Sequence, residues 1–246
     1  MGMANALSTL TVVVPVGPGD AMSPRLRAQL DALPAAAQVR VVHADAVPAS
    51  ADTATQSPPR GGPRWETLAA QRGRASQQNA GAHGAVNAWL WFLHADCELA
   101  PDSLRRAARF IDRGGDAWGY FDLRFLDDGP ALTRLNAVGA WLRSRCLHLP
   151  FGDQGLLLPR TLFERIGGFD VWLQCGEDHD LVWRLRRAGV AVRPVGAPLF
   201  TSARKYAVRG WWPTTAWHLR ETLRQPGGLD EDGESAGQEP AGRRVW

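Results

Sequence analysis

The chain has 246 residues, of which 45% are apolar and 22% charged, and its formal net charge is +3 at neutral pH. This composition is typical of a globular protein. No run approaches the roughly 18 consecutive apolar residues of a transmembrane helix, and three widely spaced cysteines fit neither a disulfide framework nor a C-x-x-C metal site. The cysteine usage favours a reducing cytoplasm.

The charge is unevenly distributed. Residues 225–246 hold five acidic side chains against two arginines, so the rest of the chain is more basic than the total suggests. A basic body favours anionic partners such as a nucleoside diphosphate, lipid phosphate or a membrane surface. No recognised nucleic-acid motif is present, and no nucleic-acid partner is expected.

The chain opens with a β-α-β pattern. Residues 10–16 (LTVVVPV) predict a buried strand, residues 23–33 a helix with Ser23 as cap and Pro24 at its first position, and residues 39–43 a second strand. This order indicates a parallel sheet with helices on its faces. Residues 46–64, rich in Pro, Ala, Ser and Gly, predict a long surface loop.

The remaining elements continue the alternation. Residues 75–85 predict a helix, and residues 88–93 (AWLWFL) a third buried strand. Helices are then expected over 101–112, 132–147, 161–166 and 178–188, and strands over 118–125, 155–158 and 190–195. We therefore expect a single α/β domain over residues 1–224 and a disordered acidic tail over 225–246.

The first candidate site follows the third strand, where the sequence reads His94-Ala95-Asp96. In open α/β sheets, ligands bind beyond the carboxyl ends of the strands. An aspartate there can hold a hard cation that also bridges phosphate oxygens. The alternative is that Asp96 caps the next element.

The second is an acidic cluster, Gly176-Glu177-Asp178-His179-Asp180, ahead of a predicted helix. Acidic side chains commonly complement the dipole at a helix N-terminus. Three carboxylates exceed what capping requires, and one of them could take a proton from an acceptor hydroxyl.

Three weaker patterns remain. Arg74 and Asn79 flank a helix start that could bind an anion, although a structural helix is an equal reading. Gly152-Asp153-Gln154 is a predicted tight turn. Near the end of the chain, basic residues that could bind diphosphate precede tryptophans that could lie at a membrane interface or pack into the core. They are Arg204, Lys205, Arg209, Trp211, Trp212 and Trp217.

Six motifs, in this order, resemble the family 2 glycosyltransferases of the GT-A fold over about residues 9–222. They are GRASQQNAGA (73–82), FLHAD (92–96), GDQ (152–154), GGF (167–169), ED (177–178) and TSAR (201–204). The resemblance implies a Rossmann-like three-layer sandwich with a mostly parallel central sheet. One departure is Gly17-Pro18-Gly19-Asp20 after the first strand, where the family normally has an Asn-Glu pair.

The resemblance also implies roles. Asp96 would bind Mg²⁺ or Mn²⁺ and through it the donor diphosphate, Asp178 would be the general base, and Glu177 would orient the acceptor or its loop. The acceptor side would hold Gly152, Asp153 and Gln154. The nucleotide and donor would be contacted by Pro15, Val16, Asp45, Arg74, Asn79, His94, Ala95, Asp96, Arg204 and Lys205.

The function implied is a metal-dependent, inverting transfer of a sugar from a nucleotide-diphosphate donor, with a UDP-sugar expected, to a hydroxyl acceptor that could be lipid-linked. Two alternatives stay open: a nucleotidyltransferase and a non-catalytic GT-A-like binding module. The expected location is the cytoplasm, with a peripheral position on the inner face of the membrane as an open alternative through Trp211, Trp212 and Trp217.

Overall fold

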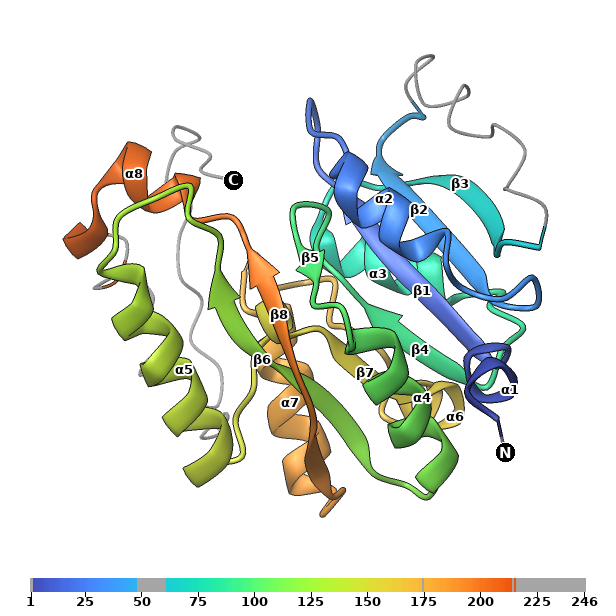
Figure 1. Cartoon of the computed structure of the whole chain (residues 1–246). Helices are drawn as coiled ribbons and strands as arrows, with labels where there is room; N and C mark the ends of the chain where they lie inside the picture. Colours follow the sequence, from blue (N-terminus) through green and yellow to red (C-terminus); the bar gives the residue numbers. More distant parts are fainter. Residues whose placement is uncertain (1, 48–60, 174, 214, 216–246) are drawn as a thin grey trace, which may run out of the picture.

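The computed structural model describes residues 2–47, 61–173, 175–213 and 215 (Figure 1). Within this part of the chain, one eight-stranded sheet runs through the molecule in the order β3-β2-β1-β4-β7-β6-β8-β5. The predicted tail and most of the predicted loop after the second strand lie outside the described residues.

The first half of the sheet is parallel. β1 (Leu10–Val16) lies between β2 (Gln38–Ala44) and β4 (Trp89–Phe92), and β3 (Arg64–Ala70) extends β2 outward. Every residue of β1 is buried, as expected for a β-branched strand covered on both faces.

Alternate residues of β1 enter two different cores, which gives the three layers. Val12, Val14 and Val16 pack with α1 (Met3–Leu7), α2 (Pro24–Leu30) and α4 (Ser103–Arg113). Val13 packs on the other face with α3 (Arg74–Ala82), α6 (Arg160–Arg165) and α7 (Glu177–Arg187). Because successive side chains of a strand point to opposite faces of the sheet, β1 contributes to the cores on both faces.

The second half of the sheet is mixed: β6 and β8 keep the direction of the first half, and β7 and β5 run against it. β7 (Leu156–Pro159) runs antiparallel to β4 and to β6 (Trp118–Phe125). β8 (Val192–Thr201) is parallel to β6, and the short β5 (Glu98–Leu99) pairs antiparallel with β8. The predicted α/β fold with a mostly parallel central sheet is confirmed.

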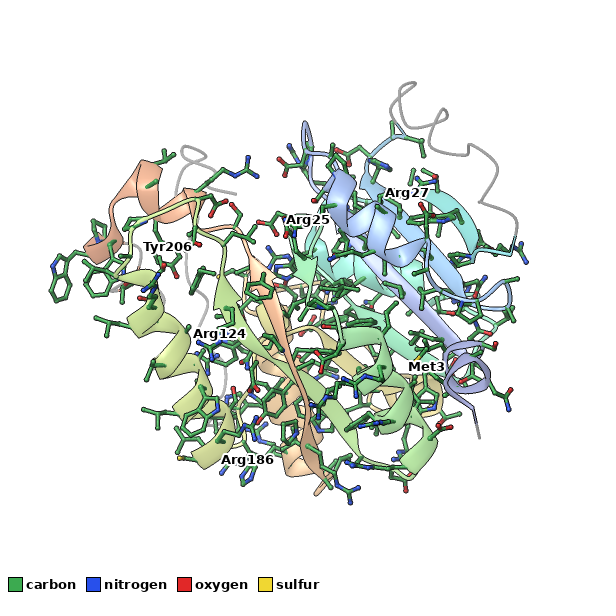
Figure 2. All side chains as sticks on the ribbon, in the orientation of Figure 1. Met3, Arg25, Arg27, Arg124, Arg186 and Tyr206 are labelled. Carbon is green, nitrogen blue, oxygen red and sulfur yellow. The ribbon has the colours of Figure 1, made fainter. Side chains whose placement is uncertain are left out.

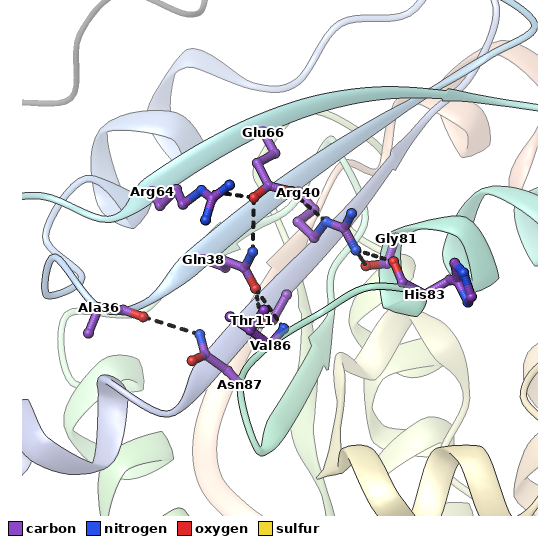
Figure 3. A network of polar contacts seen from close by, with 10 residues as sticks. All are labelled: Thr11, Ala36, Gln38, Arg40, Arg64, Glu66, Gly81, His83, Val86 and Asn87. Carbon is purple, nitrogen blue, oxygen red and sulfur yellow. Dashed lines mark hydrogen bonds and ion pairs between the residues drawn. The ribbon is translucent and has the colours of Figure 1, made fainter.

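A buried polar network holds α3 to the edge of the sheet (Figure 3). The Arg40 guanidinium donates from Nε to Glu66 Oε2 at 3.0 Å and from Nη1 to the Gly81 carbonyl at 2.8 Å, and it also contacts the His83 carbonyl. Gln38 bridges Glu66 and Thr11, each at 2.9 Å. The buried charge is paired, and carbonyls that the end of α3 would leave unsatisfied find a donor.

Four short elements were not predicted: α1, β3, β5 and α8 (Arg204–Arg209). The tight turn predicted over Gly152–Gln154 is a 3₁₀ turn. The predicted loop over 46–64 was wrong at its end, because Arg64 already belongs to β3. The predicted strand over 190–195 was too short. β8 contains Pro194, Gly196 and Pro198, which read as strand breakers, yet it pairs with β6 across a bulge and extends to Thr201. The TSAR motif therefore begins at a strand end.

α5 (Thr133–Cys146) packs against β6, with α8 beside its N-terminal end (Figure 1). Among the residues that the structure describes, no helix is long and apolar enough to cross a membrane.

Candidate functional site

The carboxyl ends of the parallel strands β1, β2 and β4 meet at one edge of the sheet. A buried side chain from α3 joins two of them: Gln77 Nε2 donates to the Val16 and Val42 carbonyls, each at 2.7 Å. The side chains of Pro15 and Val16 are buried, so any contact these residues make with a ligand uses the backbone. Gln77 was missed in the sequence, although it lies inside the GRASQQNAGA motif.

The HAD turn lies at the same edge, directly after β4. The Ala95 carbonyl accepts a hydrogen bond at 2.7 Å from the backbone N–H of Ser23, which also caps α2. The Asp96 side chain is exposed. No cluster of three or more His, Cys, Asp or Glu side chains suited to a metal occurs in the described part of the chain. A cation at Asp96 would therefore need further oxygen ligands from its substrate and from water.

Asp45 follows β2 in a left-handed backbone conformation, with φ of 64°. Its exposed carboxylate accepts from the Arg72 N–H at 3.1 Å and so ties the end of β2 to the turn that leads into α3. Asparagine and aspartate tolerate this conformation better than other non-glycine residues.

The acidic cluster forms the first turn of α7. Both Glu177 and Asp178 are buried. Asp178 Oδ2 accepts from the Gly152 N–H at 2.5 Å, and its Oδ1 accepts from the His179 N–H at 3.1 Å. An ionised carboxylate offers about four lone-pair positions, so these two bonds leave room for a further donor.

The surroundings hold the two carboxyl groups at different pKa values. Burial raises the pKa of Asp178, but His179, Arg74, the Gly152 N–H and His94 together more than offset this and lower it below its ordinary value. Burial and the neighbouring Asp178 charge raise the pKa of Glu177, against the opposing effect of Arg74. Arg74 Nη1 lies 3.4 Å from Glu177 Oε1. Two opposed carboxyl pKa values are a common feature of acid–base sites.

These contacts bring three predicted motifs together. Arg74 comes from the start of α3, His94 from the turn after β4, and Asp178 from α7. Arg74 and His94 both act electrostatically on the buried Asp178 carboxylate. Sequence spacing alone could not place these motifs next to each other.

The GDQ turn contains Gly152, whose N–H binds Asp178, and the Gln154 side chain holds this turn in place. The Gln154 Oε1 atom accepts from Ser144 Oγ at 2.8 Å, Arg143 Nη2 at 3.2 Å and the Phe151 N–H at 3.1 Å. Its Nε2 donates to the Phe121 carbonyl at 3.1 Å. All of these contacts are made inside the protein, so the Gln154 side chain anchors the GDQ turn to α5 and β6. Asp153 belongs to the same turn.

Phe151 is held between two cationic or polar groups next to this turn. Its ring stacks on the His179 imidazole, with centroids 3.4 Å apart, and the Arg143 guanidinium lies 3.5 Å from the ring centroid. Burial lowers the pKa of Arg143, whereas the Asp153 and Asp178 charges raise it. Arg143 was not among the predicted site residues. An arginine nine residues before a turn gives no sequence signal of this contact.

Asn79 has a structural contact. Its Nδ2 donates to the Phe169 carbonyl at 2.8 Å and its Oδ1 accepts from the Phe169 N–H at 2.9 Å. The side-chain amide thus binds the GGF turn, where Gly168 has a φ of 68°. Its assignment to the nucleotide pocket stays a prediction.

The TSAR segment is anchored by an aspartate that the sequence did not single out. Asp128 Oδ2 accepts from Ser202 Oγ at 2.6 Å, and its Oδ1 accepts from the Ala203 N–H at 2.7 Å. Arg204 is exposed, and its Nε donates to Ser202 Oγ at 3.0 Å. The Asp127-Asp128-Gly129 turn after a strand was the available signal. The Lys205 and Arg209 side chains lie outside the described residues.

The tryptophans after α8 differ from one another. Trp211 is half-buried and donates from Nε1 to Asn136 Oδ1 at 2.8 Å, whereas Trp212 is exposed. The predicted contact of Trp217 lies outside the described residues.

Solved structures with this fold include several glycosyltransferases. S. aureus TarS in complex with UDP-GlcNAc matches with a TM-score of 0.60 at 14% identity, over 79% of this chain and 58% of that one. The mannosyltransferase PcManGT from Pyrobaculum calidifontis, in complex with GDP-Man and Mn²⁺, matches with a TM-score of 0.61 at 19% identity, over 93% and 66%. GalNAc-T7 with UDP, GalNAc and Mn²⁺ matches with a TM-score of 0.55 at 13% identity, over 79% and 44%. The chain thus spans less than two thirds of each.

No curated protein sequence matches the chain. The model of glycosyl transferase family 2 matches residues 47–169, which is half of the 246 residues. This match includes the GRASQQNAGA, FLHAD, GDQ and GGF motifs. The chain therefore belongs to glycosyl transferase family 2.

Proposed function

We propose that the chain transfers a sugar, with inversion, from a nucleoside-diphosphate donor held at Asp96 to a hydroxyl acceptor that Asp178 deprotonates. The observation that carries this proposal is the buried Asp178 carboxylate, which accepts from the Gly152 N–H and whose pKa is lowered with the help of His94 and Arg74 from two other motifs. A UDP-sugar is the expected donor.

The donor would lie along the carboxyl edge of β1, β2 and β4. Val16 ends the first of these strands, and Asp96 and the Ala95 backbone follow the third. The structures with UDP-GlcNAc, UDP and GDP-Man concern distant relatives, and they support a nucleotide sugar as the class of donor.

The donor set at Asp96 fits a divalent metal that binds together with its substrate. Mg²⁺ and similar cations are commonly held by one or two carboxylates plus substrate phosphates and water. Asp96 supplies an exposed carboxylate at the turn where a diphosphate would lie. A bound Mg²⁺ or Mn²⁺ would offset the negative charge that builds up on the departing diphosphate. Mn²⁺ accompanies the nucleotides in GalNAc-T7 and PcManGT.

Asp178 has the charge state that a base requires. Its lowered pKa keeps it ionised at neutral pH, and the Gly152 N–H holds one oxygen in place. As the acceptor oxygen attacks the anomeric carbon, its proton passes to Asp178 while the bond between that carbon and the diphosphate oxygen breaks. A single displacement of this kind inverts the anomeric centre.

The other residues position these groups. Glu177 pairs with Arg74 and would orient the acceptor or its loop, and the backbone of Gly152-Asp153-Gln154 would border the acceptor. Arg204, together with Lys205, would face the diphosphate. The Ser202 and Asp128 contacts preset the direction of the Arg204 side chain.

The donor site is tested by calorimetric titration with UDP, GDP, CDP and ADP, each with Mn²⁺ and with EDTA. We expect one nucleotide to bind tightly, and that binding to be lost in EDTA and in Asp96→Ala. A folded protein that binds none of the four would point to the non-catalytic alternative.

The base is tested by Asp178→Asn. We expect turnover to fall by roughly 10²- to 10⁴-fold, the usual contribution of a general base, while metal-dependent nucleotide binding is retained. Asp180→Asn is the matched control. Asp180 belongs to the same acidic cluster but pairs with Arg184, with Oδ2 and Nη2 2.6 Å apart. Equal losses in both variants would contradict the assignment.

A further inference from the structure

The outward face of α5 is apolar. Its buried side is formed by Thr133, Ala137, Ala140 and Ser144. On the opposite side, at helical spacing, lie Leu135, Val138 and Leu142, of which Leu135 is 60% and Leu142 48% exposed. A helix of a globular protein normally turns polar residues to that side.

Neighbouring residues extend this apolar surface. Leu132 is exposed just before α5. On α8 and just beyond it, Val208 is 85% and Trp212 74% exposed. Asn136 fixes this segment to α5 through Trp211 and Tyr206. We call these six residues, Leu132, Leu135, Val138, Leu142, Val208 and Trp212, the α5–α8 face. A group of exposed apolar side chains on neighbouring elements is typical of an interaction site.

Arginines border the α5–α8 face. Arg134 is exposed on α5, and Arg204 on α8. Arg124 lies on the strand face that contacts α5, two residues from Asp122, which bonds Arg145 at 3.0 Å. Arg186 donates to the Leu147 carbonyl at 2.9 Å, at the other end of α5. Figure 2 shows Arg124 between α5 and β6, and Arg186 near the C-terminal end of α5. With Arg145, these five arginines outnumber the four nearby aspartates, Asp122, Asp127, Asp128 and Asp153.

We propose that the α5–α8 face docks onto an anionic lipid bilayer. Apolar side chains would enter the interface, Trp212 would lie at the headgroup level where tryptophan is enriched, and the arginines would contact lipid phosphate. A second copy of the chain is disfavoured. A twofold interface places the same patch against itself, so the arginine border would meet its own charge.

The docking face adjoins the acceptor side of the proposed site. α5 leads through residues 147–151 into Gly152. Burial and the charge of Asp153 raise the pKa of Tyr206 on α8 to about 12, so this turn and α8 are close together. The inference rests here on the proposed function: a bilayer bound at this face would present a lipid-linked hydroxyl acceptor near Asp178.

The test is flotation of the full chain with vesicles of phosphatidylcholine alone and with vesicles that also contain phosphatidylglycerol. We expect binding to the anionic vesicles, weakened by salt. Leu135→Gln/Leu142→Gln should reduce partitioning by about tenfold or more, because burial of two leucine side chains is lost. Glutamine retains a helix propensity close to that of leucine.

Met3→Gln/Val86→Gln is the control. It removes two apolar side chains of similar exposure elsewhere on the surface and should leave flotation unchanged. Donor-nucleotide binding, measured without vesicles, should be equal in all three proteins. Its absence would count against the proposed function and not against docking.

Three outcomes would overturn the proposal. The first is that the folded wild type fails to float with anionic vesicles, and the second is that the Leu135→Gln/Leu142→Gln variant floats as well as wild type. The third is that light scattering shows a wild-type dimer that this variant converts to a monomer, which would make the face an interface between copies.

Discussion

The first turn of α7 holds a carboxylate whose position and charge both depend on the neighbouring backbone. The Gly152 N–H bonds Asp178, and a Cβ atom at residue 152 would lie only 2.5 Å from Asp178 Oδ2. Glycine is required here for close approach to a side chain. The GDQ and ED motifs are thus two halves of one contact.

This contact predicts the pH dependence of transfer. The pKa of Asp178 is lowered from an ordinary value of about 3.9, so the group stays ionised across the neutral range. We therefore expect that protonation of Asp178 causes no fall in kcat/KM above about pH 4. The profile is measured under saturating metal. A limb near pH 6 that disappears in Asp178→Asn would contradict this.

The same contact predicts the effect of Gly152→Ala. The added methyl group must displace the Asp178 carboxylate, and the loss of a bond to a charged group costs about 1.5–3 kcal/mol. We expect kcat to fall by about tenfold or more, with nucleotide binding unchanged. Because the Gly152 N–H lowers the pKa of Asp178, its loss should move any acid limb upward. A variant with wild-type kcat and pH profile would refute the positioning role.

At the scale of elements, α3 connects the fold to the site. Its Gln77 joins β1 and β2, its Arg74 contacts α7, and its C-terminal end is held by the Arg40 network. The helix can lie this close because Gly81 faces Val13. A Cβ at residue 81 would be 2.2 Å from Val13 Cγ1.

Two helical glycines form a matched pair that tests this packing. Gly81→Ala should destabilise the protein by about 1–3 kcal/mol through overpacking of a rigid core. Gly139→Ala on α5 should stabilise it by about 0.4–1 kcal/mol, because its Cβ would enter open space and the unfolded chain loses freedom. Urea unfolding measures both. Equal effects would mean that helix propensity alone governs the two positions.

Elements with a strong local pattern were predicted from the sequence, and those defined by tertiary pairing were not. The run over residues 10–16 and the alternation over 118–125 match β1 and β6 at both ends. β3 reads RWETLAA, a half-buried edge strand whose polar residues join the Arg40 network. β5 has two residues and exists through its pairing with β8. Neither strand has the alternating apolar pattern from which a strand is predicted.

The same division holds in the site. Asp96, Glu177 and Asp178 were predicted because acidic residues after a strand or before a helix are visible in the chain. Gln77, Asp128 and Arg143 were missed because their roles depend on partners far away in sequence. Gln77 contacts Val16 and Val42, and Asp128 contacts Ser202 and Ala203. The family resemblance indicated which of these acidic residues to assign to the metal and which to the general base.

At the scale of the whole molecule, a parallel half and a mixed half form one continuous sheet. The parallel half, β3-β2-β1-β4, ends in the proposed donor side, whereas the GDQ and TSAR segments accompany β7 and β8 in the other half. Ligand binding at a junction of this kind should stabilise the whole domain, because the ligand contacts are lost when either half unfolds.

Donor binding is therefore expected to raise the melting temperature. A nucleoside diphosphate at about 100 times its Kd stabilises the folded state by about 2.7 kcal/mol, and a domain of this size shifts by roughly 2–4 °C per kcal/mol. We expect a rise of roughly 5–10 °C with Mn²⁺ and the best-bound nucleotide, lost in EDTA and in Asp96→Ala. Asp127→Ala is the matched control, since Asp127 is an almost fully exposed aspartate whose partner Arg134 is 4.0 Å away. An equal rise in Asp96→Ala, or with EDTA, would place the diphosphate elsewhere on the chain and leave Asp96 as a structural cap.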